Sequence, residues 1–214
     1  TGGSEKDIYI RLRQAEAEKA CENIGVFDLE FWQYPDRRLA DTQDAVARLV
    51  NLLAQFRPEL VYLPSPLELH PDHRAAAFLF KSALHHQPCA CDAAFYEISQ
   101  PLIVNTLVDI TPVHDRKQQA LQMYESQLAE KNYEDICMAL NRFRSLTLAE
   151  TITHAEGFCV YPASRIRACN IFSLFYPDEK KLRSCPLNQY GSGTKWGAKV
   201  LSLLKNTFSF RKNI

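Results

Sequence analysis

The sequence contains no long apolar run, no cysteine framework and no excess of charge, and each absence excludes a class of protein. No apolar stretch approaches the ~18 residues that a membrane-spanning helix requires. A formal net charge of zero gives the whole chain no bulk attraction to nucleic acid. The seven cysteines are scattered, which favours a reducing compartment such as the cytoplasm. Cys89 and Cys91 form a C-x-C pair, but no second pair lies at zinc-finger spacing from it.

A glycine-rich phosphate loop is also absent. No G-x-G-x-x-G follows any predicted strand, and the stretch TGGSE at the start is too short a signal for a nucleotide-binding loop. What is present is the composition of an ordinary globular protein, in a chain long enough for one large domain.

Hydrophobic periodicity predicts helices and strands that alternate along the chain. Helices are expected at residues 7–24, 45–56, 71–85, 109–128 and 133–146, the first of them ending at Gly25. Strands are expected at residues 27–34, 59–64, 93–98, 102–110 and 155–161. This order predicts an α/β fold with a mostly parallel sheet, arranged as a Rossmann-like three-layer sandwich.

The last part of the chain, residues 179–214, differs in charge from the rest. After Glu179 there are eight basic and no acidic side chains, so that residues 1–179 carry 17 basic against 25 acidic side chains, a net charge of −8. Within the tail, Trp196, Val200, Leu203, Leu204 and Phe208 fall near one helical face. Residues 195–212 therefore predict a basic amphipathic helix at an anionic membrane surface. The alternative is a terminal helix packed on its own domain.

A cluster of titratable residues, LHPDH, lies where a predicted strand gives way to a helix. Ligands of α/β proteins bind at the carboxyl ends of strands, so His70 and His73 are expected at a binding site. Both could bind zinc, or one could bind zinc while the other acts as an acid or hydrogen-bond donor. Asp72 is close enough to fix one imidazole tautomer. The competing interpretation is that His70 and Asp72 only cap the helix and His73 is a surface residue.

Several ordered motifs give a family resemblance over residues 1 to about 160. The segments TGG, RLRQAEAEKACENIGV, YPDRRL, RPELVYLPSPLELHPDHRAA, VDITPVHDRKQQALQMYESQL and AEGF resemble the PIG-L/LmbE-like family of zinc-dependent N-deacetylases. The resemblance implies that zinc is the cofactor. It also implies hydrolysis of the acetamide of an N-acetylated amino sugar, in a small glycoside or on a lipid carrier, to give acetate and a free amine.

The resemblance also implies a role for each matching residue. His73 corresponds to a zinc ligand, and His70 to the histidine that protonates or stabilises the tetrahedral intermediate, with Asp72 as its orienting partner. Arg13 corresponds to an arginine near the acetyl or oxyanion side, and Asp36 to an aspartate that lines the substrate site. Taken alone, Arg13 could be an exposed helix arginine, and Asp36 could form a turn after Pro35.

The sequence departs from the family in one motif. The family's A-H-P-D-D-E type motif, which supplies a zinc-binding histidine and aspartate and the general base, has no counterpart here. We therefore expect the chain to begin after the first strand, helix and second strand, with residues 1–178 as an N-terminally truncated deacetylase domain that is unstable when isolated. The alternative function is a non-catalytic sugar- or metal-binding domain that acts through a partner.

Overall fold

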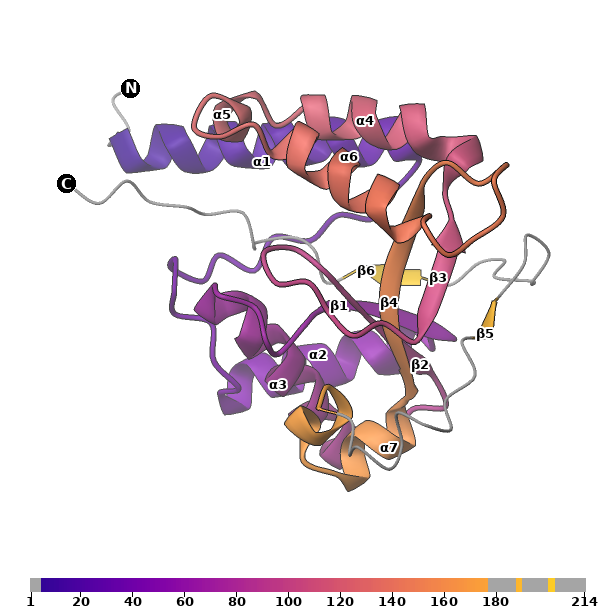
Figure 1. Ribbon diagram of the computed structural model, residues 1–214. Helices are drawn as coiled ribbons and strands as arrows, with labels where there is room; N and C mark the ends of the chain where they lie inside the picture. Colours follow the sequence, from indigo (N-terminus) through magenta and orange to yellow (C-terminus); the bar gives the residue numbers. More distant parts are fainter. Residues whose placement is uncertain (1–4, 177–187, 190–199, 203–214) are drawn as a thin grey trace. The chain divides into compact units, whose positions relative to one another are not determined.

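The structure, a computed structural model, describes residues 5–176, 188–189 and 200–202 (Figure 1). These residues form two compact units. A helical unit contains residues 5–32 and 108–156, and a sheet unit contains residues 33–107, 157–176, 188–189 and 200–202. The predicted division at residue 178 stays a prediction, because nearly all of the tail lies outside the described residues.

The helical unit is built around its N-terminal helix. It contains α1 (Glu5–Ile24), η1 (Thr111–Val113), α4 (His114–Gln122), α5 (Glu125–Leu128) and α6 (Tyr133–Arg144). Helix α1 packs against α4 and α5, and α6 packs against the same two helices. The helix predicted at residues 109–128 is instead the end of a strand followed by three short helical segments. The helical spacing of apolar residues continues across the breaks between these segments, so the sequence pattern did not reveal the breaks.

Gly25 ends helix α1, as the sequence predicts. Its φ of 80° lies in the left-handed region, where glycine carries no side-chain penalty. The Gly25 N–H donates to the Glu22 carbonyl at 3.0 Å, and the Val26 N–H donates to the Cys21 carbonyl at 2.8 Å. These two bonds are those of a Schellman motif, which satisfies carbonyls that would otherwise lack partners at the helix end.

The sheet unit combines a mixed sheet with helices. Its helices are α2 (Gln43–Phe56), α3 (Pro71–His86), α7 (Ala163–Ala168) and the short η2 (Ile171–Leu174). The sheet has the order β5-β3-β4-β2-β1-β6. Its strands are β1 (Leu60–Pro64), β2 (Asp92–Tyr96), β3 (Thr106–Asp109), β4 (Ala155–Pro162), β5 (Asn188–Gln189) and β6 (Val200–Ser202), and the boundary between the two units falls within β3 and β4.

Strand β1 pairs in parallel with β2 and β6, and β3 pairs in parallel with β5, whereas β2 and β4 are antiparallel. The predicted α/β class is therefore confirmed, with a mixed sheet. Val200–Ser202, within the segment predicted as an amphipathic helix, is a strand. The rest of that segment lies outside the described residues.

Strand β1 is apolar on both faces, which explains its uninterrupted apolar sequence. Val61 and Leu63 are fully buried on one face. On the other face, Leu60 packs in a cluster with Ala94 and Phe158. A short strand with both faces covered is typical of parallel sheets flanked by helices.

The strand predicted at residues 27–34 is wrong, since this segment forms neither helix nor strand. Of its alternating apolar residues, Leu29 and Phe31 are partly buried but Phe27 is 80% exposed, so burial does not follow the alternation. A strand also needs a neighbour for its backbone hydrogen bonds.

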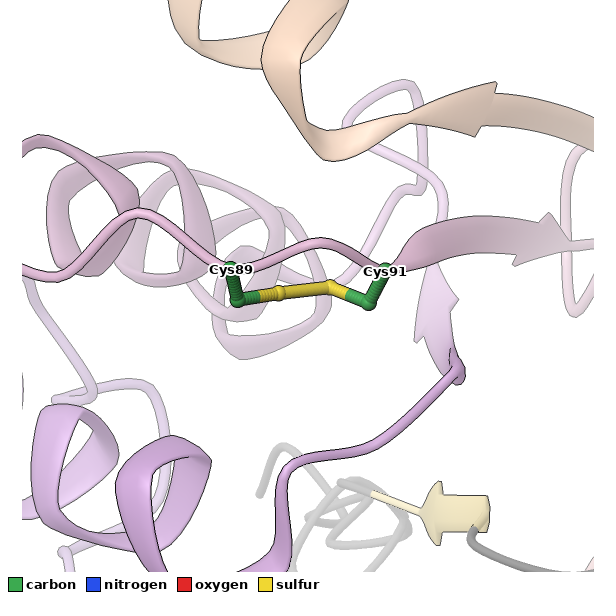
Figure 2. Close-up of a disulfide and its surroundings, with 2 residues drawn as sticks. All are labelled: Cys89 and Cys91. Carbon is green, nitrogen blue, oxygen red and sulfur yellow. A yellow bond between two sulfur atoms is a disulfide. The ribbon is translucent and has the colours of Figure 1, made fainter.

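Cys89 and Cys91 are joined by a disulfide immediately before β2 (Figure 2). A reducing compartment, which the scattered cysteines favour, would keep cysteines as free thiols, and this disulfide differs from that expectation. No helix in the described part of the chain is long and apolar enough to cross a bilayer.

Candidate active site

The site is built on the loop that connects β1 to α3. Pro71 occupies the first turn of α3, where its missing N–H costs no hydrogen bond. His70 is the N-cap, and its Nδ1 accepts a hydrogen bond from the Asp72 backbone N–H at 3.3 Å. The capping role predicted for His70 is thus confirmed. His73 is only 1% exposed, so the interpretation of His73 as a surface residue is wrong.

The cap fixes the tautomer of His70. Because Nδ1 accepts a hydrogen bond, the proton of the neutral ring lies on Nε2. This Nε2 lies 3.4 Å from Oδ1 of Asp36. The carboxylate that faces the imidazole of His70 is therefore that of Asp36, whereas the sequence interpretation gave this place to Asp72.

The Asp72 carboxylate holds a different segment of the chain. Its Oδ2 accepts the Arg37 N–H at 2.8 Å, and its Oδ1 accepts the Leu39 N–H at 3.1 Å. Arg37 has a φ of 59°, a left-handed conformation that costs free energy for a residue other than glycine. The Arg38 N–H also donates to the Pro35 carbonyl at 3.1 Å. Asp36 thus lies in a turn, as one interpretation predicted, and Asp72 holds this turn beside His70.

Burial and a neighbouring imidazole keep His70 neutral. Burial is the main cause that lowers the pKa of His70, and His73, whose ring centroid is 4.9 Å away, lowers it further. Asp72 and Asp36 oppose this effect without reversing it. The ring is therefore a neutral hydrogen-bond donor near pH 7.

Glu68 is a buried acid of the site that the sequence interpretation missed. It is 1% exposed, and its Oε2 lies 3.7 Å from Nδ1 of His73. Burial by itself raises the pKa of Glu68, but its contacts with His73, Ser99 and the Ile98 N–H outweigh burial and lower the pKa. The neighbouring Leu69 is 66% exposed, so this acid is covered and this leucine is not. Hydrophobicity alone would have predicted the opposite burial for these two residues.

Three side chains of this site have the donor chemistry of a metal centre. Asp36, His70 and Asp72 each offer one ligand atom, and these atoms lie within 4.8 Å of one another. Carboxylate oxygens with imidazole nitrogen suit zinc and related divalent ions. Oδ1 of Asp36 is also buried without accepting a hydrogen bond from any described residue. The residues therefore fit a divalent cation, although the sequence interpretation assigned the ligand role to the adjacent His73.

Arg13 lies in the helical unit, in a polar cluster of its own. Its Nη1 donates to Glu16 and to Oγ of Ser126, each at 3.3 Å, and its guanidinium lies over the ring of Tyr124. Glu16 also accepts the Ser126 N–H at 2.7 Å. The Arg13 side chain is 12% exposed, so the alternative of an exposed helix arginine is wrong. Burial lowers the pKa of Arg13, and Glu16 opposes this effect. Its predicted role at the substrate stays a prediction.

Together these features define an α/β protein with a buried histidine–carboxylate cluster after a parallel strand. The PIG-L family model, described as GlcNAc-PI de-N-acetylase, matches residues 1–84. This match includes Arg13, Asp36 and the whole H-P-D-H segment. Residues 1–84 are therefore similar to the PIG-L family.

A curated relative extends this similarity. The diacetylchitobiose deacetylase of Thermococcus kodakarensis is 30% identical over an alignment of 154 residues, and the match covers 63% of this chain. The matched region is 57% of that relative's own length, so this chain spans little more than half of it.

Solved structures show the same fold. A conserved protein of Thermus thermophilus has a TM-score of 0.62 at 26% identity, covering 70% of this chain and 72% of its own. The N,N'-diacetylchitobiose deacetylase of Pyrococcus horikoshii has a TM-score of 0.63 at 24% identity, covering 77% and 68%. The 4-carboxy-2-hydroxymuconate hydratase of Pseudomonas putida has a TM-score of 0.62 at 24% identity, covering 75% of each chain. A hydratase and a deacetylase thus share this fold, so the function must be argued from the site.

Proposed function

We propose that this chain carries the site of a zinc-dependent N-deacetylase that removes the acetyl group of an N-acetylated amino sugar. The reaction is hydrolysis of the acetamide, which releases acetate and a free amine. The observation that supports this most directly is that the two histidine rings have different polar neighbours. The Asp72 N–H places the His70 proton on Nε2, while a carboxylate faces Nδ1 of His73.

The two histidines are thereby suited to different tasks. With its proton on Nε2, His70 is a hydrogen-bond donor for the oxyanion that develops on the acetamide oxygen. Asp36 orients this ring and stabilises positive charge on it when it gives or receives a proton. His73, with its proton on Nδ1, keeps a lone pair on Nε2 for a metal ion.

A bound zinc ion supplies a polarised acetamide carbonyl and a water of lowered pKa. His73 is the proposed zinc ligand.

The test of activity is acetate release by the purified native protein from a panel of N-acetylhexosaminides that includes diacetylchitobiose. Zinc-dependent release of acetate from at least one sugar is expected. Binding of zinc and sugar without any acetate release would support the alternative, a non-catalytic domain that acts through a partner.

The test of the roles is a pair of substitutions. His73→Ala should remove bound zinc, which metal analysis measures directly. His70→Ala should retain zinc and lower turnover by roughly 10²- to 10⁴-fold, the usual contribution of a positioned acid–base group. His86→Ala, at the exposed end of α3, is the matched control and should change neither quantity. Equal loss of zinc from the His73 and His70 variants would contradict the division of roles.

A further inference from the structure

Glu68 lies in the loop between β1 and α3, five residues before His73, and it connects two loops of the sheet unit. Its Oε1 accepts the Ile98 N–H at 2.9 Å, and its Oε2 accepts the Ser99 N–H at 3.0 Å and the Ser99 hydroxyl. Ser99 belongs to the loop that follows β2, the parallel neighbour of β1. One carboxylate therefore ties together the loops at the carboxyl ends of two adjacent strands.

The backbone of Glu68 is also fixed. The Arg74 guanidinium, from the first turns of α3, donates to the Glu68 carbonyl at 2.8 Å and to the Leu69 carbonyl at 2.7 Å. The Glu68 N–H donates to the Ser65 carbonyl at 3.2 Å. With its main chain and side chain both held, Glu68 presents Oε2 to His73 in a fixed direction. Burying a carboxylate is costly, and these hydrogen bonds offset that cost.

From this arrangement we infer that Glu68 is a positioning residue, which holds His73 with its proton on Nδ1 and so keeps Nε2 available for the metal. The inference rests on the proposed role of His73 as a zinc ligand. A carboxylate beside one ring nitrogen stabilises the proton there and leaves the lone pair on the other nitrogen. At 3.7 Å the contact is longer than a hydrogen bond, so the attraction is electrostatic.

The same short segment thereby sets two tautomers by different means. A backbone N–H donor places the His70 proton on Nε2, and the negative charge of a nearby carboxylate favours the His73 proton on Nδ1. If both rings had the same tautomer, Nε2 would carry a proton in both and donate, or would carry a lone pair in both and be able to bind a metal. Glu68 is thus the residue that makes the two histidines of H-P-D-H chemically different.

The experiment compares Glu68→Gln with the native protein. An amide nitrogen in place of Oε2 would face the Ser99 N–H and Nδ1 of His73 as a donor, so it would no longer favour a proton on Nδ1. The first measurement is the imidazole ¹⁵N spectrum of the metal-free protein, with His73→Ala used for assignment. We expect the Nδ1–H form of His73 in the native protein and a shift toward Nε2–H in Glu68→Gln.

The second measurement is zinc affinity by chelator competition, which should fall by roughly 10- to 100-fold in Glu68→Gln. Ser99→Ala is the matched control, because it removes a hydroxyl bonded to Glu68 and leaves the carboxylate beside His73. It should retain the Nδ1–H form and the zinc affinity.

Two results would overturn the inference. One is an Nε2–H form of His73 in the native metal-free protein, which decides the question even if Glu68→Gln does not fold. The other is an unchanged tautomer and zinc affinity in a folded Glu68→Gln. Failure of the proposed function would look different, because the native protein would then bind no zinc, or His73→Ala would bind it normally, whatever tautomer His73 adopts.

Discussion

Asp72 serves two segments of the chain at once. Its backbone N–H donates to Nδ1 of His70, the N-cap of α3, and its carboxylate accepts the N–H groups of Arg37 and Leu39. The site therefore depends on a residue that shapes it without meeting the substrate in our proposal. Such a residue affects stability and site geometry together, since the turn that carries Asp36 is held by the same carboxylate.

Asp72→Asn should destabilise the protein. The amide group can accept only one of the two backbone N–H groups, and its own N–H₂ would face the other. Leaving a buried donor without its acceptor costs roughly 1–3 kcal/mol. Urea unfolding measures this loss, and Asp115→Asn, whose side chain is 92% exposed, is the control that should change little. Equal stability of the Asp72 and Asp115 variants would contradict the anchoring role.

His154 should make the stability of the helical unit depend on pH. The rings of His114 and His154 are stacked with centroids 3.8 Å apart. Burial, then His114 and Arg142, lower the pKa of His154, and Asp115 opposes them. Because the folded state binds this proton less readily than the unfolded state, the contribution of His154 to stability is present above pH ~6.5 and is lost as the pH falls through its lowered pKa.

His154→Gln should therefore reduce the loss of thermal stability between pH 7 and pH 5. Unfolding midpoints measured across this range, with His86→Gln as the control, test it. A variant whose acid sensitivity equals that of the native protein would refute the assignment.

The sequence could identify most residues of the site but not their partners. His70, Asp72, His73 and Asp36 were all found from motifs. Their hydrogen bonds were not, because they join segments about 30 residues apart, such as Asp72 to Arg37 and Glu68 to Ser99. Which carboxylate faces which imidazole depends on tertiary packing, and no local pattern records it.

At the scale of elements, the end of α1 tests the rule that glycine is favoured where a helix ends with a positive φ. Gly25→Ala would place a side chain at a φ of 80°. Among the described residues, the added Cβ would meet only the Arg116 guanidinium, at an ordinary 3.6 Å, so the cost is conformational rather than steric. We expect a destabilisation of about 1 kcal/mol.

Urea unfolding measures this cost as well. Ala129→Gly, at the C-cap of α5, where the backbone is right-handed, is a contrasting control for the effect of glycine content on the unfolded state. An unchanged or increased stability in Gly25→Ala would show that this helix end does not constrain the fold.

Elements whose signals are local were predictable, and those defined by a partner were not. Helices α2 and α3 and strand β1 match their predicted ranges within about two residues, because capping residues and prolines mark their ends. The segment 27–34 has the alternation of a strand but no strand beside it in the structure described. The pattern is a property of the segment, whereas pairing is a property of the sheet.

At the scale of the whole molecule, charge is divided along the chain. The tail carries eight basic side chains, and the preceding residues carry a net charge of −8. If the tail contacts membranes as predicted, replacing Lys195, Lys199 and Lys205 by Gln should weaken binding to anionic vesicles by roughly 100-fold, at about 1 kcal/mol for each charge. Vesicle sedimentation at low and high salt measures this, with neutral vesicles as the control. Equal binding of native protein and variant would contradict the prediction.

The helical unit is assembled from two stretches of chain that leave the ribosome far apart in time. Helix α1 is complete at Ile24, but its partner α4 begins at His114, about 90 residues later. At ~5–20 residues per second, the nascent helix must wait roughly 5–20 s for the surface that covers it. During this interval Ala20, buried in the finished unit, is exposed to solvent or to chaperones. The packing of this unit around α1 therefore cannot be complete until α4 has been synthesised.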